Sequence, residues 1–113
     1  MRQLETFQLI LLRRPAEAPE YEEATLESIQ QQHLAHYDAL RSDGRLVTFG
    51  PVLEQHDVSL RGIAVFAMGS VDEARALAET DPAVAAGRLA VEAMTYLTAP
   101  GSLTPPGIPV ALG

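Results

Sequence analysis

The chain has 113 residues, of which 47% are hydrophobic and 20% charged, and its formal net charge is −7. These values are typical of one globular domain and exclude a disordered or fibrous chain. All eight basic residues are arginines and cysteine is absent, so the composition argues against nucleic-acid partners and excludes disulfides and thiolate sites.

The amino-terminal segment predicts one strand followed by a loop. Hydrophobic side chains alternate over residues 5–12, the period of a strand with one face more buried than the other. The apolar run from Leu9 to Leu12 is too short for a signal-peptide core or a membrane span, so we expect no membrane partner and, by default, a cytoplasmic location. Residues 14–22 contain two prolines and are expected to form the loop.

A long helix is expected after Pro19, because no proline or glycine interrupts the chain from there to Gly44. Gly44 suits the left-handed residue that closes a helix. Five side chains recur at spacings of three and four and would share one helical face: Leu26, Ile29, His33, Tyr37 and Leu40. The pattern therefore places a histidine among the residues that face the sheet.

Three further strands are predicted. Residues 46–49 are rich in strand formers, and the Gly50-Pro51 pair ends them, since proline cannot donate to a central ladder. Residues 63–68 are apolar at every position, so both faces of this strand need cover. Residues 88–97 alternate as a last strand.

A shorter helix and a turn separate the last two strands. Ser70 and Glu73 have the spacing of a capping box, which predicts a helix through about Thr80. Asp81-Pro82 then has the pattern of a second cap, with proline at the first helical position, and opens a turn that Gly87 closes.

The predicted order is strand, helix, strand, strand, helix, strand. This is the order of a ferredoxin-like α+β domain, an antiparallel sheet with both helices on one face. The other face is left bare, and a patch of that size is more than monomers usually expose. Two sheets packed face to face would cover it, so we expect a homodimer built as a dimeric α+β barrel from a domain spanning residues 1–98.

Residues 99–113 are expected to form a proline-rich carboxyl-terminal arm. This segment carries no charged residue and contains four large aliphatic side chains: Leu103, Ile108, Val110 and Leu112. Such a composition favours an arm docked on a surface over a free solvated end, although disorder concentrates at chain termini.

His33 is the first candidate for catalysis, because imidazole can take or give a proton near neutral pH. Asp81 could orient that ring and stabilise its charged form. Each residue also has a structural alternative. A histidine on an apolar helical face is more often a core residue with a satisfied hydrogen bond, and an aspartate before proline is an ordinary helix cap. The residues alone leave both alternatives open.

Metal binding is the weaker hypothesis. His33 with His36, or His56 with Asp57, could in principle share an ion, but no His-Glu-x-x-His or Glu-x-x-His pattern is present. No Gly-rich phosphate loop and no nucleophile elbow occurs either. We therefore predict no metal and no cofactor.

The set His33, Gly44, Gly50-Pro51, Asp81-Pro82 and Gly87 resembles, in order and spacing, the YCII-related family of small proteins. The resemblance extends from the first strand to about Leu97. It implies a dimeric α+β barrel and a His-Asp site formed by His33 and Asp81. A few members of that family act on small, often aromatic or chlorinated, ring compounds by elimination or isomerisation.

Two residues depart from the family pattern. Gln30 stands where an arginine is common three residues before the histidine, which puts binding of an anionic substrate in doubt. Ala83 stands where an aromatic residue is common, which leaves a wider pocket or a weaker wall.

Two functions are compatible with these residues. The first is a lyase or isomerase that uses His33 and Asp81 for proton transfer, with Tyr37 and Phe49 as pocket walls and Gly50-Pro51 beside a small ring compound. The second is a non-catalytic ligand-binding or interaction module on the same dimeric fold. Whether His33 and Asp81 line a solvent-reachable cavity distinguishes the two.

Overall fold

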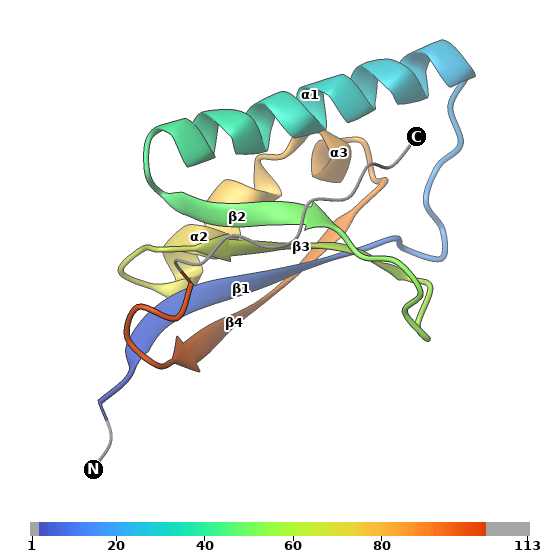
Figure 1. Cartoon of the computed structure of the whole chain (residues 1–113). Helices are drawn as coiled ribbons and strands as arrows, with labels where there is room; N and C mark the ends of the chain where they lie inside the picture. Colours follow the sequence, from blue (N-terminus) through green and yellow to red (C-terminus); the bar gives the residue numbers. More distant parts are fainter. Residues whose placement is uncertain (1–2, 104–113) are drawn as a thin grey trace.

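The computed structural model describes residues 3–103. They form one four-stranded antiparallel sheet with the helices on one of its faces (Figure 1). The strands are β1 (Glu5–Arg13), β2 (Leu46–Pro51), β3 (Leu60–Phe66) and β4 (Ala90–Thr98). Their order across the sheet, β2-β3-β1-β4, confirms the predicted ferredoxin-like arrangement.

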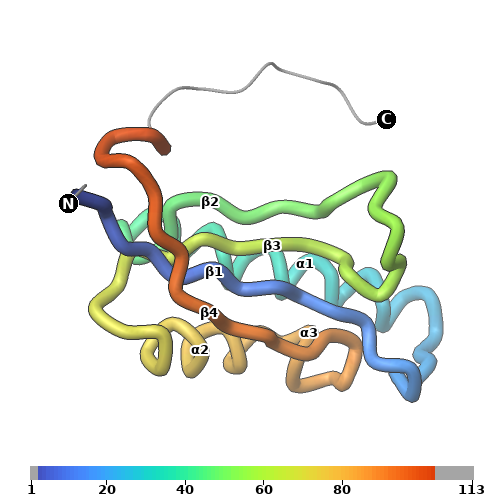
Figure 2. The backbone as a smooth tube through the Cα atoms, turned by 90° about the horizontal axis from the view of Figure 1, so that it is seen from below, coloured from blue at the N-terminus to red at the C-terminus, as the bar shows by residue number. Residues whose placement is uncertain are grey.

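The helices are α1 (Glu23–Ser42), α2 (Val71–Glu79) and α3 (Pro82–Ala85). In a view turned by 90°, the sheet lies in front and all three helices lie behind it (Figure 2). Gly44 follows α1 with a φ of 87°, the left-handed conformation expected of it. The Ser70 side chain caps α2 by accepting from the Glu73 amide at 3.1 Å, as its spacing predicts.

The core lies between the sheet and the helices. Alternate residues of the two central strands point into it, among them Ile10 and Leu12 of β1 and Ala64 and Phe66 of β3. The buried amide of Gln8 bonds to both the amide and the carbonyl of Met68, at 2.7 and 2.9 Å, so this polar group is paired at both its oxygen and its nitrogen. The helices and the sheet are thus joined by one continuous apolar layer.

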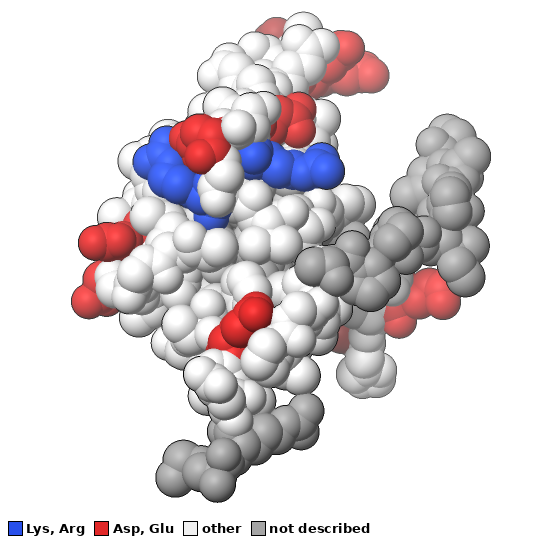
Figure 3. All heavy atoms as spheres, turned by 60° about the vertical axis from the view of Figure 1, so that its left-hand side comes forward, with Lys and Arg blue, Asp and Glu red and all other residues white. Residues whose placement is uncertain are grey.

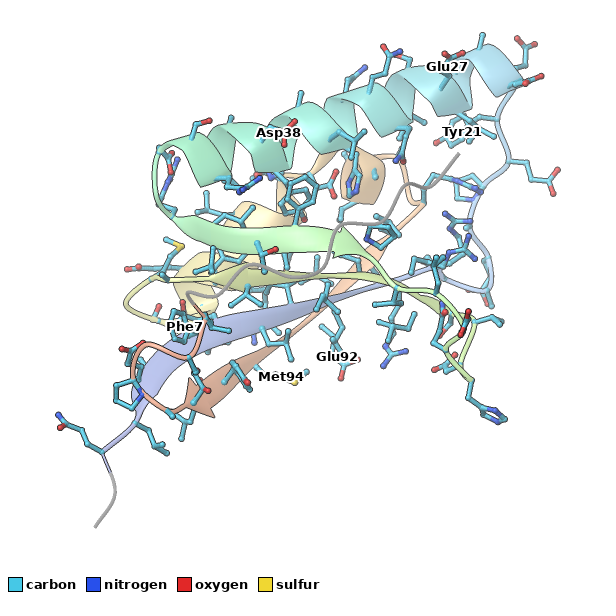
Figure 4. The ribbon with its side chains drawn as sticks, in the orientation of Figure 1. Phe7, Tyr21, Glu27, Asp38, Glu92 and Met94 are labelled. Carbon is cyan, nitrogen blue, oxygen red and sulfur yellow. The ribbon has the colours of Figure 1, made fainter. Side chains whose placement is uncertain are left out.

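The opposite face of the sheet has no helix over it. The register places Leu9 beside both Val65 and Met94 on this face, and Leu11 beside Ile63 and Glu92. Figure 4 shows Glu92 and Met94 pointing away from the helices. Leu9, Leu11, Ile63 and Met94 are half-buried in the single chain, so this face keeps apolar surface in contact with solvent.

Some expected strand bounds need adjustment. Strand β2 includes Gly50 and Pro51 instead of ending before them, since both pair with β3. The third strand covers Leu60–Phe66 rather than residues 63–68, because Arg61 and Gly62 still belong to the strand although they interrupt the apolar pattern, and Gly62 pairs with both β1 and β2. The proline-rich arm lies mostly outside the described residues, since residues 104–113 are not among them. The division into a domain of residues 1–98 and an arm of residues 99–113 stays a prediction.

The charged side chains are mixed. On the face drawn in Figure 3, the basic side chains form one small group with acidic side chains beside it, and most of the face is neutral. Arg45 and Asp43 form one surface ion pair, at 2.6 Å. Within residues 3–103, no helix combines the length and the hydropathy that crossing a bilayer requires.

Candidate functional site

His33 projects from the inner face of α1 toward α3. Its Nδ1 lies 2.7 Å from Oδ2 of Asp81, so the contact expected from the sequence is present. The His33 side chain is 12% exposed, whereas that of Asp81 is fully buried. The imidazole is therefore held by a carboxylate on its inner side and remains reachable from outside.

Both carboxylate oxygens of Asp81 are used. Oδ1 accepts from the Ala83 amide at 2.8 Å and so caps α3, while Oδ2 faces Nδ1 of His33. The structural and the functional interpretations of Asp81 are thus compatible. An ionised carboxylate can only accept, so with Asp81 ionised the proton of this contact is assigned to Nδ1, and Nε2 of a neutral ring carries the lone pair. No described residue forms a hydrogen bond with Nε2.

Tyr37 lies behind His33 rather than on a cavity wall, which corrects the expectation from the helical stripe. Its ring is fully buried, forms a T-shaped contact with the His33 ring at 5.2 Å between centroids, and stacks on Phe49 at 5.2 Å. The Tyr37 hydroxyl has no hydrogen-bond partner of ordinary geometry among the described residues. Burial raises its pKa above the usual range, and the nearby Asp81 charge raises it further.

A cavity of about 230 Å³ opens beside His33. Phe49, Gly50 and Pro51, expected from the sequence to contact a ligand, all line it. Gly62 forms part of the wall, and a Cβ at this position would lie 2.9 Å from the Gly50 carbonyl oxygen. The close approach of β2 and β3 therefore requires a glycine there. The remaining lining residues are Leu12, Arg14, Gln30, Leu34, Arg61 and Leu89.

The sequence did not indicate the two charged residues of this lining, Arg14 and Arg61. They lie just after β1 and near the start of β3, where a single arginine is ordinary surface composition, and only the fold brings them together. A second cavity of about 560 Å³ adjoins the first and shares Arg14, Gln30 and Leu89 with it. Figure 4 shows Tyr21 and Glu27 near the amino-terminal end of α1.

The two histidine pairs considered for a metal are engaged elsewhere. Nε2 of His36 lies 3.0 Å from the Leu77 carbonyl, and it must donate to that oxygen. Asp57 pairs with Arg13 at 3.0 Å and with the Ser59 hydroxyl at 2.7 Å. Within residues 3–103, no cluster of three or more His, Cys, Asp or Glu side chains is arranged to hold a metal ion.

Known proteins that resemble this chain do so in fold and in family pattern. A search of the curated proteins finds no significant match. Among solved structures, the chain is similar to the 5-chloro-2-hydroxyhydroquinone dehydrochlorinase of Burkholderia phenoliruptrix AC1100, solved in complex with 2,5-dihydroxybenzoquinone. The identity is 21% and the TM-score 0.55, over 78% of this chain and 90% of that one, a likeness in fold.

The family model of the YCII-related domain matches residues 8–96, which include every strand and helix of the structure in whole or in part. The match also includes His33, Asp81 and the residues that line the inner cavity. The chain therefore belongs to the YCII-related family.

Proposed function

We propose that the protein is a small-molecule lyase or isomerase in which His33 transfers a proton and Asp81 holds its ring. The observation that carries the proposal is the contact of Nδ1 with the buried Asp81 carboxylate, beside a cavity that His33 itself lines. A histidine with only a structural role in the core need not border a cavity of ligand size.

The chemistry follows from the fixed tautomer. With Nδ1 donating to Asp81, the Nε2 lone pair can take a proton from a carbon or hydroxyl of the substrate. In an elimination, the electrons of the broken C–H or O–H bond move into the ring, the substituent leaves with the electron pair of its bond to the ring, and Nε2 then releases the proton to solvent. In an isomerisation, Nε2 returns the proton to a different atom. In both cases Asp81 stabilises the transient imidazolium, and no redox step is required.

The substrate class we propose is a small oxygenated ring compound. Three features support it: the flat walls offered by Phe49 and Pro51, the backbone of Gly50 and Gly62, and the volume of about 230 Å³, which is below the roughly 300 Å³ at which drug-sized sites begin. The structural neighbour is a dehydrochlorinase solved with 2,5-dihydroxybenzoquinone, which adds weight to the same class.

The test is a turnover screen of the purified full chain with chlorinated hydroxyhydroquinones, halogenated phenols and small ring lactones. We expect turnover of at least one class, and a loss of at least a hundredfold in His33→Asn, since a positioned proton-transfer group contributes about 10²–10⁴. His36→Asn is the matched control. It lies one turn along the same helix and should retain activity. Equal losses in both variants would contradict the role of His33.

The alternative is a non-catalytic binding module with the same fold. It predicts that ring compounds bind without turnover, and that His33→Asn changes affinity only. The position of His33 on the cavity wall favours the enzyme, because a pure binding pocket gains nothing from a ring whose inner nitrogen is fixed by a buried carboxylate.

We also propose that two copies pair through the open face of the sheet. The face presents half-buried apolar side chains from both central strands, among them Leu9, Leu11 and Ile63. Phe66 faces the helices and Val65 the open side, so only Val65 could meet a partner. Val65 is already buried within one chain, and Leu9 is therefore the better position at which to introduce a charge.

Leu9→Glu should convert the dimer to a monomer, because association would bury an unpaired charge at a cost of several kcal/mol. Ala35→Glu, on the exposed side of α1, should leave the dimer intact. Light scattering at micromolar concentration measures both. A wild-type protein that is already a monomer would rule out the pairing.

A further inference from the structure

Three of the eight basic residues of the chain gather at the His33 cavity and its neighbour. Arg14 lines both adjoining cavities, Arg61 lines the inner one beside His33, and Arg88 lines the outer one. The chain carries a net charge of −7, so a local excess of positive charge is contrary to its overall balance. Such a concentration in a cavity indicates a ligand of opposite charge.

None of these three arginines forms an ion pair with an acid among the described residues. Among the described residues, the arginines that form ion pairs are Arg13, Arg45 and Arg75. Glu23 and Glu27 line the outer cavity together with Arg14 and Arg88, but they form no ion pair with them. The positive charge around the inner cavity is therefore left without a partner in the part of the protein that the structure describes.

Two of the arginines are nevertheless held in position. Arg14 Nε donates to the Arg88 carbonyl at 2.7 Å, and Arg88 Nη1 donates to the Pro19 carbonyl at 3.0 Å. These neutral acceptors fix the guanidinium groups without cancelling their charge. Arg14 keeps both Nη groups for a ligand, and no described residue accepts a hydrogen bond from the Arg61 side chain. Much of the site is thus organised before a ligand binds.

The electrostatics agree with the geometry. Burial lowers the pKa of the Arg14 guanidinium, and the positive charges of Arg88 and Arg61 lower it further. Arginine still remains charged at every physiological pH. Arg14 lines one cavity with Arg61 and the adjoining cavity with Arg88, so an anion bound there would relieve the repulsion between these like charges.

We propose that Arg14 and Arg61 bind an ionised oxygen group, a carboxylate or an acidic ring hydroxyl, on the compound that occupies the His33 cavity. The identity of that compound as a ring substrate rests on the proposed function, whereas the anion site rests on the arginines alone. Guanidinium groups bind planar oxyanions through paired, charge-assisted hydrogen bonds. Gln30 borders both cavities as a neutral side chain, so the arginines supply the charge.

The probe is benzoate, compared with benzamide, a neutral molecule of almost the same shape. Calorimetric titration of the full chain gives both affinities. NMR chemical shifts of the Gly50 and Gly62 backbone amides report whether the probe enters the cavity. We expect benzoate to bind at least about tenfold more tightly than benzamide. Equal affinities for the two probes, or no saturable binding of benzoate, would overturn the proposal.

Substitutions of single arginines show which side chains bind the anion. Arg61 is exposed and its side chain forms no hydrogen bond with a described residue, so Arg61→Gln should fold normally and weaken benzoate binding about tenfold without changing benzamide binding. Arg14→Gln should act in the same direction, and Arg88→Gln more weakly. The control is Arg75→Gln on α2, whose partner is Asp72 at 2.6 Å. An equal loss in the control would show only a general charge effect and would overturn the site.

Two further measurements separate the anion site from catalysis and define the anion. His33→Asn should retain benzoate binding even if it abolishes turnover, so failure of the proposed reaction leaves the binding result standing. Competition of benzoate with 2,5-dihydroxybenzoquinone tests whether the site also binds an acidic ring hydroxyl. If the quinone displaces benzoate at a similar or lower concentration, the site binds that group as well. Displacement by inorganic phosphate at the same concentration would overturn the assignment to a ring compound.

Discussion

His33 and His36 lie one turn apart on α1, yet their surroundings differ. Both are partly buried, and both form T-shaped contacts with the Tyr37 ring, at 5.2 and 5.0 Å between centroids. His33 contacts a buried carboxylate and lines a cavity, whereas His36 contacts the Leu77 carbonyl and lines neither of the two adjoining cavities at His33. Burial alone therefore does not distinguish the two histidines. Their hydrogen-bond acceptors and their access to a cavity do.

The two contacts also require opposite tautomers. A carbonyl and a carboxylate both accept, so the proton lies on Nδ1 of His33 and on Nε2 of His36. The lone pair of His33 is consequently on Nε2, the nitrogen that does not contact Asp81. Nε2 of His33 can therefore accept a proton, as the proposed reaction requires, whereas Nε2 of His36 donates to a carbonyl of α2.

The largest expected effect comes from removing the carboxylate. Asp81→Ala deprives the Ala83 amide of its cap and the His33 ring of its acceptor, and both donors are buried or nearly so. We expect the free energy of unfolding to fall by about 2–4 kcal/mol. Urea unfolding followed by circular dichroism measures it. A loss below about 0.5 kcal/mol would show that this contact does not support the fold.

Asp81→Asn separates the charge of the side chain from its size, which it preserves. Its carbonyl oxygen can still accept from the Ala83 amide, but its amide group would meet the Nδ1 proton of His33. We expect a smaller loss of stability than in Asp81→Ala, together with a loss of turnover close to that of His33→Asn. Turnover retained in Asp81→Asn would show that the tautomer of His33 is irrelevant.

The smallest effect concerns Tyr37, the ring shared by the two histidines. Its buried hydroxyl lacks a partner of ordinary geometry, so Tyr37→Phe should change the stability at neutral pH by less than about 1 kcal/mol. The raised pKa of Tyr37 keeps the folded state protonated while the unfolded chain ionises above roughly pH 10. Stability should therefore fall more steeply above about pH 10 in the wild type than in Tyr37→Phe. Thermal unfolding from about pH 8 to 11 gives both slopes.

Much of the fold could be predicted from the sequence, because its signals are local. The stripe on α1, the Ser70 cap, the Asp81-Pro82 start and Gly44 each depend on a few neighbouring residues. The start of β3 was harder to predict, since pairing with two flanking strands extends it through Arg61 and Gly62 whatever their polarity. Tertiary hydrogen bonding there prevails over the apolar pattern.

The site was predictable only in part. His33, Asp81, Phe49, Gly50 and Pro51 carry local signals or belong to a motif. Spacing on a helix cannot tell whether a ring such as Tyr37 faces a cavity or the layer behind it, since both lie on the same side. Arg14 and Arg61 lie far apart in the chain, at the ends of two different strands, and no periodicity connects them.

Proton transfer by His33 requires a free lone pair on Nε2, and long-range proton–nitrogen NMR of the histidine rings observes that atom directly. We expect the proton on Nδ1 of His33 and on Nε2 of His36. Addition of benzoate or 2,5-dihydroxybenzoquinone should shift Nε2 of His33 and leave His36 unchanged. A neutral His33 ring protonated on Nε2, or a His33 signal that neither compound moves, would contradict the assignment of His33 as the proton-transfer group.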